Sequence, residues 1–459
     1  MRGARVAWLA YAAIGGAMTA LALAAWSRAL LLDGPVLYGE GAVAHAAILT
    51  RSLAADADTG QGAAVTAANY PPLYFVIAAA GDPFIVGRIA SIAATLAVAG
   101  LIAWRARGAG RLVPAALGLG WLALAPVAIW GPAVKPDLAA LALTVGGVLA
   151  LERRRAGLAA ALVVAAMLAK PTAGFVALAL IGWIAWRDRG LLVPFARALG
   201  IAIAVAAIAL LPFGYAGLWR HAVEWNALPW SLEPALLLLF LAMVIYAALL
   251  GTGILARAFA AGPIAAYAVG ALPIVLAGGR EGATINYLLD LGAAGSLALA
   301  SVAPRLRLAP FYPLVALANL LLAVLVLDPL GVVPGRAATT GAWGDPARIA
   351  SAAAALGGDE AVLAEDSGLL LATGHRVSVD DLFLWSRLVA AGAIDPGPVV
   401  TDVRAARFTA IVSETDLAQL AAAPAYERAR WDPSLVRAVT ERYRLASRAA
   451  GGLFIYRPR

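Results

Sequence analysis

About eleven apolar segments, separated by short polar turns, dominate this sequence of 459 residues. A helix needs roughly 20 apolar residues to cross the hydrocarbon core of a bilayer, and most of these segments approach that length. Hydrophobic residues make up 63% of the chain and charged residues 14%, whereas a soluble domain is about half apolar and about a quarter charged. The sequence therefore predicts an all-α polytopic membrane protein. The predicted spans are 6–30, 83–104, 112–130, 135–151, 156–169, 171–186, 198–214, 232–252, 259–278, 284–302 and 308–327.

Two of these spans meet at Lys170–Pro171. Because proline ends or kinks a helix, segments 156–169 and 171–186 are either two short spans or one long broken helix. The first segment begins like a signal peptide, but its apolar run is too long for one. We therefore interpret it as a retained first helix.

Arginines cluster in alternate turns between the spans. Cytoplasmic loops are enriched in Arg and Lys, so we expect these turns and the N-terminus to lie in the cytoplasm. The alternation holds at every turn when 156–169 and 171–186 count as two spans. The net charge of +8 then reflects these turns, with no nucleic-acid partner expected. The arginines are Arg2, Arg5, Arg105, Arg107, Arg111, Arg153, Arg154, Arg155, Arg187, Arg189, Arg197, Arg257, Arg305 and Arg307.

The composition changes near residue 330, beyond which acids and arginines are mixed. Short runs of helical and strand character alternate there, which is typical of a small α/β domain. The helical runs are 345–357 and 381–392, and the strand runs are 360–366, 408–414 and 452–458. We predict a membrane domain at 1–330, with a first outer loop at 31–82, and an extracytoplasmic α/β domain at 331–459. The expected location is the plasma (inner) membrane.

The first outer loop carries candidates for acid–base chemistry. Glu40 lies between two glycines, which let a backbone approach another molecule closely, and it is the preferred base. Asp33, directly after the first span, is the alternative. The run Asn-Tyr-Pro-Pro-Leu-Tyr at 69–74 predicts an extended turn. Arg88 lies inside the second span, where an arginine costs roughly 2.5–3.5 kcal/mol and needs a partner such as a lipid phosphate or an outer acid.

Lys135 and Lys170 are the two lysines of the chain, and each precedes a proline at the outer end of a helix. Snorkelling anchors are one interpretation. A compact ammonium also suits a phosphate as a point charge, so we favour a role near a lipid phosphate or in holding a catalytic acid. Asp137, two residues after Lys135, either caps its helix or orients an acceptor.

A further polar group lies at the outer end of the predicted span 284–302. Asp290 lies one turn inside that span, where an ionisable residue indicates a functional site. The chain has no cysteine, which excludes a thiolate metal site or nucleophile. No spacing of His, Asp or Glu resembles a metal site, so no metal ligand is predicted. The polar residues before Asp290 are Arg280, Glu281, Asn286 and Tyr287.

In their order along the chain, these motifs resemble the GT-C superfamily of membrane glycosyltransferases, which use polyprenyl-phosphate sugars. The similarity is greatest to the family 39-like branch, related to protein O-mannosyltransferases and lipid A aminoarabinose transferases, and it runs over the whole chain. The motifs are the acidic first loop, 69–74, Gly87-Arg88, Lys135-Pro136-Asp137, Ala169-Lys170-Pro171-Thr172, Asn286-Tyr287-Leu288 and the outer α/β domain.

The resemblance implies an inverting transfer of a sugar from a polyprenyl-phosphate donor to an extracytoplasmic acceptor, at the membrane lipid surface. A first-loop carboxylate, Glu40 or Asp33, would take the acceptor proton, with Asp137 in support. The family often has an Asp-Glu pair where this chain has Gly39-Glu40, which leaves the choice of base open. Related families differ in their need for a divalent cation.

The remaining candidates fall into two groups. The donor-phosphate candidates are Arg88, Lys135, Lys170 and Arg280, and the substrate-binding candidates are His45, Asn69, Tyr70, Tyr74, Glu281, Asn286 and Tyr287. A non-catalytic polyprenyl-lipid or glycan transporter is the alternative function. A transporter would place its polar residues near the membrane midplane. The candidate residues map instead to the outer face of the membrane, which favours the transferase.

Overall fold

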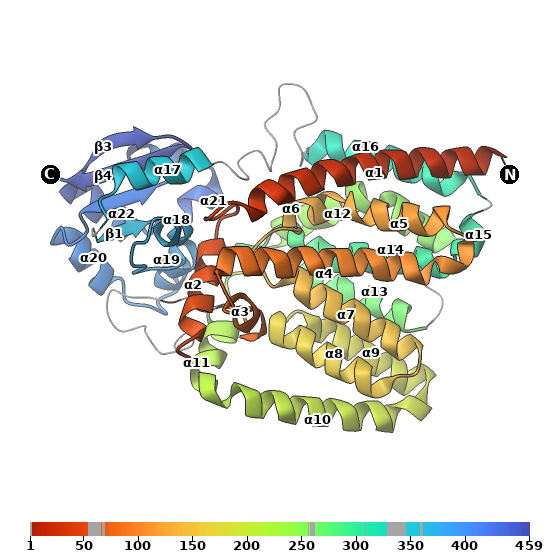
Figure 1. The fold of residues 1–459 in the computed structure, drawn as a ribbon. Helices are drawn as coiled ribbons and strands as arrows, with labels where there is room; N and C mark the ends of the chain where they lie inside the picture. The colour runs from red at the N-terminus through yellow and green to blue at the C-terminus, as the bar shows by residue number, and fades with distance from the viewer. Residues whose placement is uncertain are drawn as a thin grey trace. The chain divides into compact units, whose positions relative to one another are not determined.

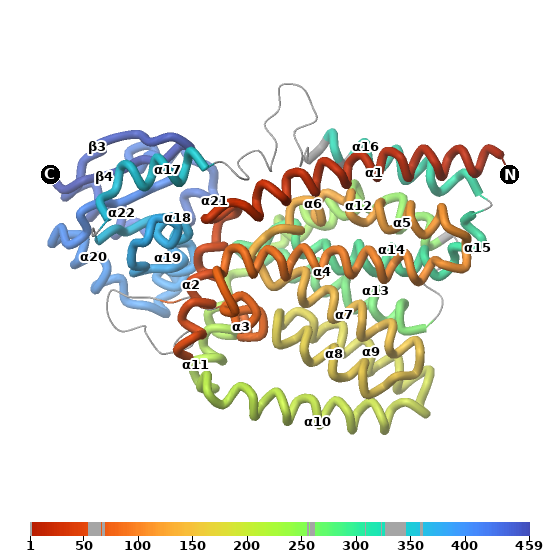
Figure 2. The backbone as a smooth tube through the Cα atoms, viewed as in Figure 1, coloured from red at the N-terminus to blue at the C-terminus, as the bar shows by residue number. Residues whose placement is uncertain are grey.

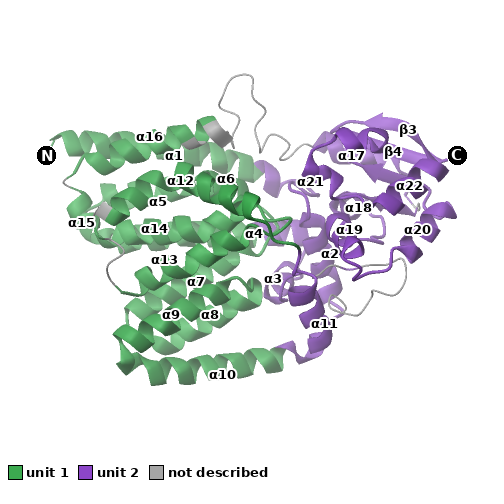
Figure 3. Ribbon diagram, turned by 180° about the vertical axis from the view of Figure 1, so that it is seen from behind, with its two compact units in different colours: residues 1–27, 89–209, 229–341 green, residues 28–88, 210–228, 342–459 purple. Residues whose placement is uncertain are grey.

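The computed structural model describes residues 2–53, 66, 69–255, 257, 262–307, 309–327, 346–358 and 361–459 (Figure 1). The predicted domain boundary near residue 330 lies outside these residues. Contacts divide the chain into two compact units (Figure 3). Unit 1 comprises Met1–Ser27, Ile89–Ala209 and Pro229–Gly341, and unit 2 comprises Arg28–Arg88, Leu210–Leu228 and Ala342–Arg459.

Unit 1 is helical. Four helices of the described chain are long and apolar enough to cross a membrane, and shorter apolar helices accompany them. The helices that lie wholly or largely in unit 1 are α1 (Arg2–Leu30), α4 (Pro83–Arg105), α5 (Leu112–Leu122), α6 (Ala125–Trp130), α7 (Asp137–Glu152), α8 (Ala156–Ala169), α9 (Ala173–Arg187), α10 (Leu192–Leu210), α12 (Leu232–Leu255), α13 (Gly262–Ala277), α14 (Leu289–Ser301), α15 (Ala303–Leu306) and α16 (Phe311–Leu327). Short 3₁₀ turns are η1 (Arg107–Ala109), η2 (Arg189–Leu191) and η5 (Ile285–Leu288).

Every predicted apolar segment contains a helix, and the predicted all-α membrane architecture is confirmed. Segment 112–130 is divided into α5 and α6, because Leu124 is extended. The chain also turns at Lys170, whose backbone is extended (φ −147°, ψ 121°), as expected for a residue that precedes proline. Helices α8 and α9 are therefore two separate helices (Figure 2).

Unit 2 contains a four-stranded sheet with the order β1-β2-β4-β3. Strands β1 and β2 are parallel, and the other two pairs are antiparallel. The strands are β1 (Val362–Ala364), β2 (Ala410–Ser413), β3 (Tyr443–Ala449) and β4 (Leu453–Pro458). The helices and turns are α2 (Glu40–Thr50), α3 (Leu73–Ala78), η3 (Leu211–Phe213), α11 (Tyr215–Trp219), η4 (Arg220–Glu224), α17 (Pro346–Ala355), α18 (Ser367–Ala372), α19 (Leu382–Ala390), α20 (Gly397–Arg404), η6 (Leu417–Ala422), α21 (Ala425–Arg428) and α22 (Pro433–Arg442).

The sheet separates two apolar cores, because side chains alternate between the faces of a strand. On β2, Ile411 packs into a core with Trp385 of α19 and Leu435 of α22. Its neighbour Val412 packs into a second core with Leu370 of α18. Helices thus cover both faces, and the predicted α/β character of this region is confirmed.

By its contacts, the described part of the predicted first outer loop, 31–82, groups with unit 2. Helix α2 packs against α18. A side chain at Gly41 would overlap the backbone nitrogen of Gly368 and the hydroxyl of Ser367. Gly41 and Gly368 therefore allow the N-termini of α2 and α18 to approach within backbone contact.

We expect Gly41→Ala to lower the stability of the protein by about 1–3 kcal/mol, because the added methyl group would overlap the backbone of Gly368, which cannot rotate away. Gly182→Ala in α9 is the matched control, since no atom lies within 4 Å of the added methyl group. Alanine in a helix should leave that variant unchanged or about 1 kcal/mol more stable. Thermal unfolding in detergent measures both variants, and equal midpoints would contradict the close packing of α2 on α18.

Candidate functional site

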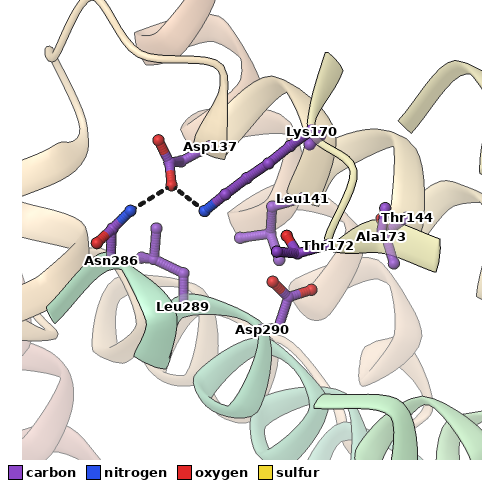
Figure 4. Close-up of a pocket in the computed structure, with 10 residues that line it drawn as sticks. Asp137, Leu141, Thr144, Lys170, Thr172, Ala173, Asn286, Leu289 and Asp290 are labelled. Atoms are coloured by element: carbon purple, nitrogen blue, oxygen red, sulfur yellow. Dashed lines mark hydrogen bonds and ion pairs between the residues drawn. The ribbon is translucent and has the colours of Figure 1, made fainter. Parts of the chain in front are cut away.

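The polar residues of unit 1 meet at the ends of three helical segments (Figure 4). Asp137 begins α7, directly after Pro136. Lys170 occupies the extended turn between α8 and α9. Asn286 lies in the short 3₁₀ turn that leads into α14, where Asp290 occupies the first helical turn. Proline or a tight turn thus places each polar group at a helix end.

An ion pair forms the centre of this group. The Lys170 Nζ atom lies 2.5 Å from Asp137 Oδ1, and Asn286 donates its amide to the same oxygen at 2.7 Å. Asp137 is 4% exposed and Lys170 is 8% exposed. A buried charge needs a partner to offset its lost hydration, and each of these two charges supplies the partner of the other.

Tyr287 connects this ion pair to a second cation. Its ring lies 4.7 Å from the Lys170 ammonium, and its hydroxyl accepts a hydrogen bond from Arg280 at 3.2 Å. Asp290 accepts a hydrogen bond from Tyr267 of α13 at 3.0 Å. We call the group Asp137, Lys170, Asn286 and Asp290 the polar cluster.

The polar cluster lines a small hollow with a volume of about 10 Å³. That volume holds about one water molecule. Thr144, Thr172 and apolar side chains of α7, α9 and α14 complete the lining. The hollow is therefore a polar space between otherwise apolar helices.

Several predicted residues thus lie together in unit 1, although they come from three distant parts of the sequence. Lys135 and Glu281 also belong to unit 1, and both are half-buried. The sequence did not identify Tyr267, which donates to Asp290, or Thr144, which lines the hollow. Each is a single hydroxyl in or beside an apolar helix, and no spacing pattern distinguishes it from an ordinary structural residue.

In unit 2, Glu40 and Arg88 form a fully buried ion pair. Arg88 Nη2 lies 3.1 Å from Glu40 Oε2, and both side chains are 0% exposed. Arg88 also donates to the carbonyls of Leu32, at 2.6 Å, and Gly34, while Glu40 accepts from the Val36 amide at 2.9 Å. The pair therefore holds the start of the first loop by its backbone.

Asp33 differs from Glu40 because its side chain is exposed. The other first-loop candidates make contacts inside unit 2. His45 Nδ1 lies 3.4 Å from Asp380 Oδ2. Tyr74 donates to the Gly87 carbonyl at 2.8 Å, and the Asn69 carbonyl accepts from Asn226 at 2.6 Å. Tyr70 is half-buried.

The C-terminal part of the chain contacts the first loop through Tyr38. The Tyr38 hydroxyl accepts from the Phe383 amide at 3.0 Å, and the Arg430 guanidinium lies 4.0 Å from the centre of its ring. Arg430 is held in turn by Glu365, with an Nη1–Oε1 distance of 2.9 Å. The sequence did not suggest the contacts of Tyr38, which join residues hundreds of positions apart.

Asp366, which caps α18, is a buried acid with a displaced pKa. Its carboxylate accepts from the Gly368 amide at 2.9 Å. Burial raises the pKa of Asp366 from 3.8 to about 6; the Arg348 guanidinium opposes this rise, and the Glu40 carboxylate adds to it. The carboxyl thus titrates near neutral pH in the folded protein.

No family model and no curated protein matches the sequence. Two solved structures share its fold, and both are of the aminoarabinose transferase ArnT from Cupriavidus metallidurans. The apo structure is 15% identical with a TM-score of 0.53, and 96% of each chain is covered. The structure bound to undecaprenyl phosphate is 14% identical with a TM-score of 0.54, and covers 96% of this chain and 97% of that one.

The chain therefore has a GT-C-like fold, as its motif order predicted. Within the described ranges, no group of three His, Cys, Asp or Glu residues could hold a metal ion.

We expect Glu40→Gln to destabilise the protein by about 3–5 kcal/mol, because it leaves the Arg88 guanidinium buried without a countercharge. The control is Glu152→Gln, which breaks a bidentate pair with Arg105 whose side chains are each 28% exposed. That change should cost at most about 1 kcal/mol. Thermal unfolding in detergent compares the two, and similar losses would show that the Arg88 pair does not anchor the fold.

The raised pKa of Asp366 predicts a pH dependence. Between about pH 4 and pH 6 the unfolded chain loses this proton while the folded protein keeps it, so this group lowers stability as the pH rises through that window. Asp366→Asn retains a capping side chain and removes the titration. The variant should be more stable than the wild type at pH 7, by up to about 3 kcal/mol.

Melting temperatures measured from pH 4 to pH 8 test this expectation. Asp432→Asn, at the capping position of α22, controls for the exchange of a capping Asp for Asn. If the Asp366→Asn and wild-type curves run parallel over the whole range, the burial of an ionised Asp366 does not affect folding.

Proposed function

We propose that this protein is a membrane glycosyltransferase that moves a sugar from a polyprenyl-phosphate donor to an extracytoplasmic acceptor, with inversion. The observation that carries the proposal is the buried Lys170–Asp137–Asn286 contact in a GT-C-like fold. Charged groups are expensive inside apolar helices, and they generally mark a binding or transport pathway. One of the structures that share the fold binds undecaprenyl phosphate, and we extend that ligand class to this chain.

We assign the general base to Asp33. Sequence reasoning preferred Glu40, but the Glu40 carboxylate is buried against Arg88 and the loop backbone. A base must reach the proton of the acceptor hydroxyl, either directly or through one water molecule. Asp33 is exposed and immediately precedes the Gly34 carbonyl that Arg88 holds, so the Arg88–Glu40 pair would position the loop that carries the base.

The cations of unit 1 suit the other half of the reaction. When the acceptor oxygen attacks the anomeric carbon, the bond to the polyprenyl phosphate breaks and negative charge grows on the leaving phosphate. Fixed cations stabilise such developing charge in a site that excludes water. We propose Lys135 and Arg280 for this role. We propose that Lys170 orients the carboxylate of Asp137.

The orientation of the chain in the membrane is part of the same proposal. We place the N-terminus in the cytoplasm and the C-terminal sheet outside, in the plasma membrane, since the arginine-rich turns then face inward. A lipid-linked donor explains why a transferase would be embedded in a membrane. The acceptor is then a glycan, lipid or protein that reaches the outer face.

Transfer of a radiolabelled sugar from a polyprenyl-phosphate donor tests the proposal in membranes that contain the full chain. We expect Asp33→Asn to lower turnover by about 10²–10⁴-fold, because the amide cannot take a proton. Glu441→Gln, which neutralises an exposed carboxylate on α22, is the matched control and should retain wild-type turnover.

Two results would count against this assignment. Wild-type turnover in Asp33→Asn would exclude it as the base. Net translocation of the lipid-linked sugar across vesicles, without covalent transfer, would identify a transporter. Glu40→Gln alone does not distinguish a base from a structural acid, since the loss of its ion pair also affects folding.

A further inference from the structure

The hollow in unit 1 has a charge balance that does not suit a phosphate. Three ionisable side chains line it: Asp137, Lys170 and Asp290. In their ordinary charged forms they sum to one negative charge, and the ammonium of Lys170 already lies 2.5 Å from Asp137. An anion entering the hollow would therefore meet one compensated cation and a second carboxylate.

The size of the hollow leads to the same conclusion. Its volume of about 10 Å³ accommodates about one water-sized group. A phosphodiester has a central phosphorus atom with four oxygens and is larger than that volume. A single hydroxyl group does.

The hydrogen-bonding groups around the hollow match a hydroxyl in detail. A hydroxyl donates one hydrogen bond and accepts up to two. Asp290 offers a carboxylate, held in place by the Tyr267 hydroxyl at 3.0 Å, and Lys170 and Asn286 offer N–H donors. In Figure 4 the Asp290 carboxylate points toward Thr172, whose hydroxyl also lines the hollow.

Asp137 supplies an independent sign of a missing partner. Its Oδ1 atom accepts from both Lys170 and Asn286. Its Oδ2 atom is buried and has no hydrogen-bond partner among the described residues. Buried polar atoms are generally satisfied, so an exception beside a polar hollow points to a donor that the described residues do not provide.

We propose that this hollow is a hydroxyl-binding subsite that recognises one hydroxyl of an uncharged sugar and excludes phosphate. Asp290 accepts the one hydrogen bond that the ligand hydroxyl donates, while Lys170 and Asn286 orient the carboxylate of Asp137. This inference rests on the proposed function for its ligand, since the sugar would be that of the polyprenyl-linked donor. The donor phosphate would then bind other cations of the protein.

Binding to the full chain in lipid nanodiscs tests the subsite directly. The probes are a panel of neutral methyl hexosides and pentosides, followed by saturation-transfer NMR, and undecaprenyl phosphate, followed by calorimetry. Asp290→Asn keeps the size of the side chain and removes its charge. We expect it to weaken the bound glycoside about 10- to 100-fold, the range for a hydrogen bond to a charged group, with undecaprenyl phosphate affinity unchanged within threefold.

Two further variants keep the test interpretable. Tyr267→Phe removes the hydroxyl that holds Asp290 and should weaken glycoside binding about 3- to 10-fold. Thr252→Val is the matched control, because it changes a buried polar side chain of α12 that does not line the hollow. It should leave binding of both probes unchanged.

The results that would overturn the subsite are distinct from those that concern the transferase. Absence of glycoside binding to the wild type, or equal binding to wild type and Asp290→Asn, would exclude it. A tenfold change in undecaprenyl phosphate affinity in Asp290→Asn would place the phosphate at the hollow instead. If glycosides bind and Asp290→Asn abolishes that binding, but no polyprenyl-linked sugar is transferred, the subsite stands and the proposed function fails.

Discussion

The structure depends on one constraint: a charge removed from water must meet a countercharge within its own fold. An unpaired ion in an apolar interior costs several kcal/mol, which is a large part of the net stability of a protein. The Lys170–Asp137 pair meets this constraint in unit 1, and the Arg88–Glu40 pair meets it in unit 2. Each pair joins segments separated by more than thirty residues, so each also fixes the turn or loop that carries it.

The same constraint separates structural charges from chemically available ones. Arg88 and Glu40 satisfy each other and the loop backbone, and neither is exposed. Asp33 lies in the same loop and faces solvent. In the described part of unit 1, Asp137 has a hydrogen-bond partner at one oxygen only. A carboxylate that is held rigidly and left incompletely satisfied is suited to bind a hydroxyl or to take its proton, because its remaining acceptor capacity is directed and costs no reorganisation.

Local sequence signals predicted the parts of this molecule that depend on local physics. Apolar length identified the helical segments, Pro171 indicated the break at Lys170, and apolar runs identified three of the four strands. Strand β3 was missed because most of its side chains are exposed, so its sequence Tyr-Arg-Leu-Ala-Ser-Arg-Ala lacks the alternation of a half-buried strand. The first loop joins unit 2 through Tyr38 and Gly41, whose partners lie more than 300 residues away, and no local pattern encodes such contacts.

A separation of hydroxyl and phosphate recognition follows from electrostatics. Two unit charges about 4 Å apart interact by roughly 4 kcal/mol at an effective dielectric of 20. A phosphate beside Asp290 would therefore meet a repulsion about as large as its attraction to a single lysine at the same distance, and Lys170 is already paired with Asp137. The polar cluster gains from a ligand that has hydrogen-bond donors and no charge. In a transferase for lipid-linked sugars, this arrangement would hold the sugar with carboxylates and leave the phosphate to cations elsewhere. The leaving group could then depart without breaking the contacts that orient the sugar.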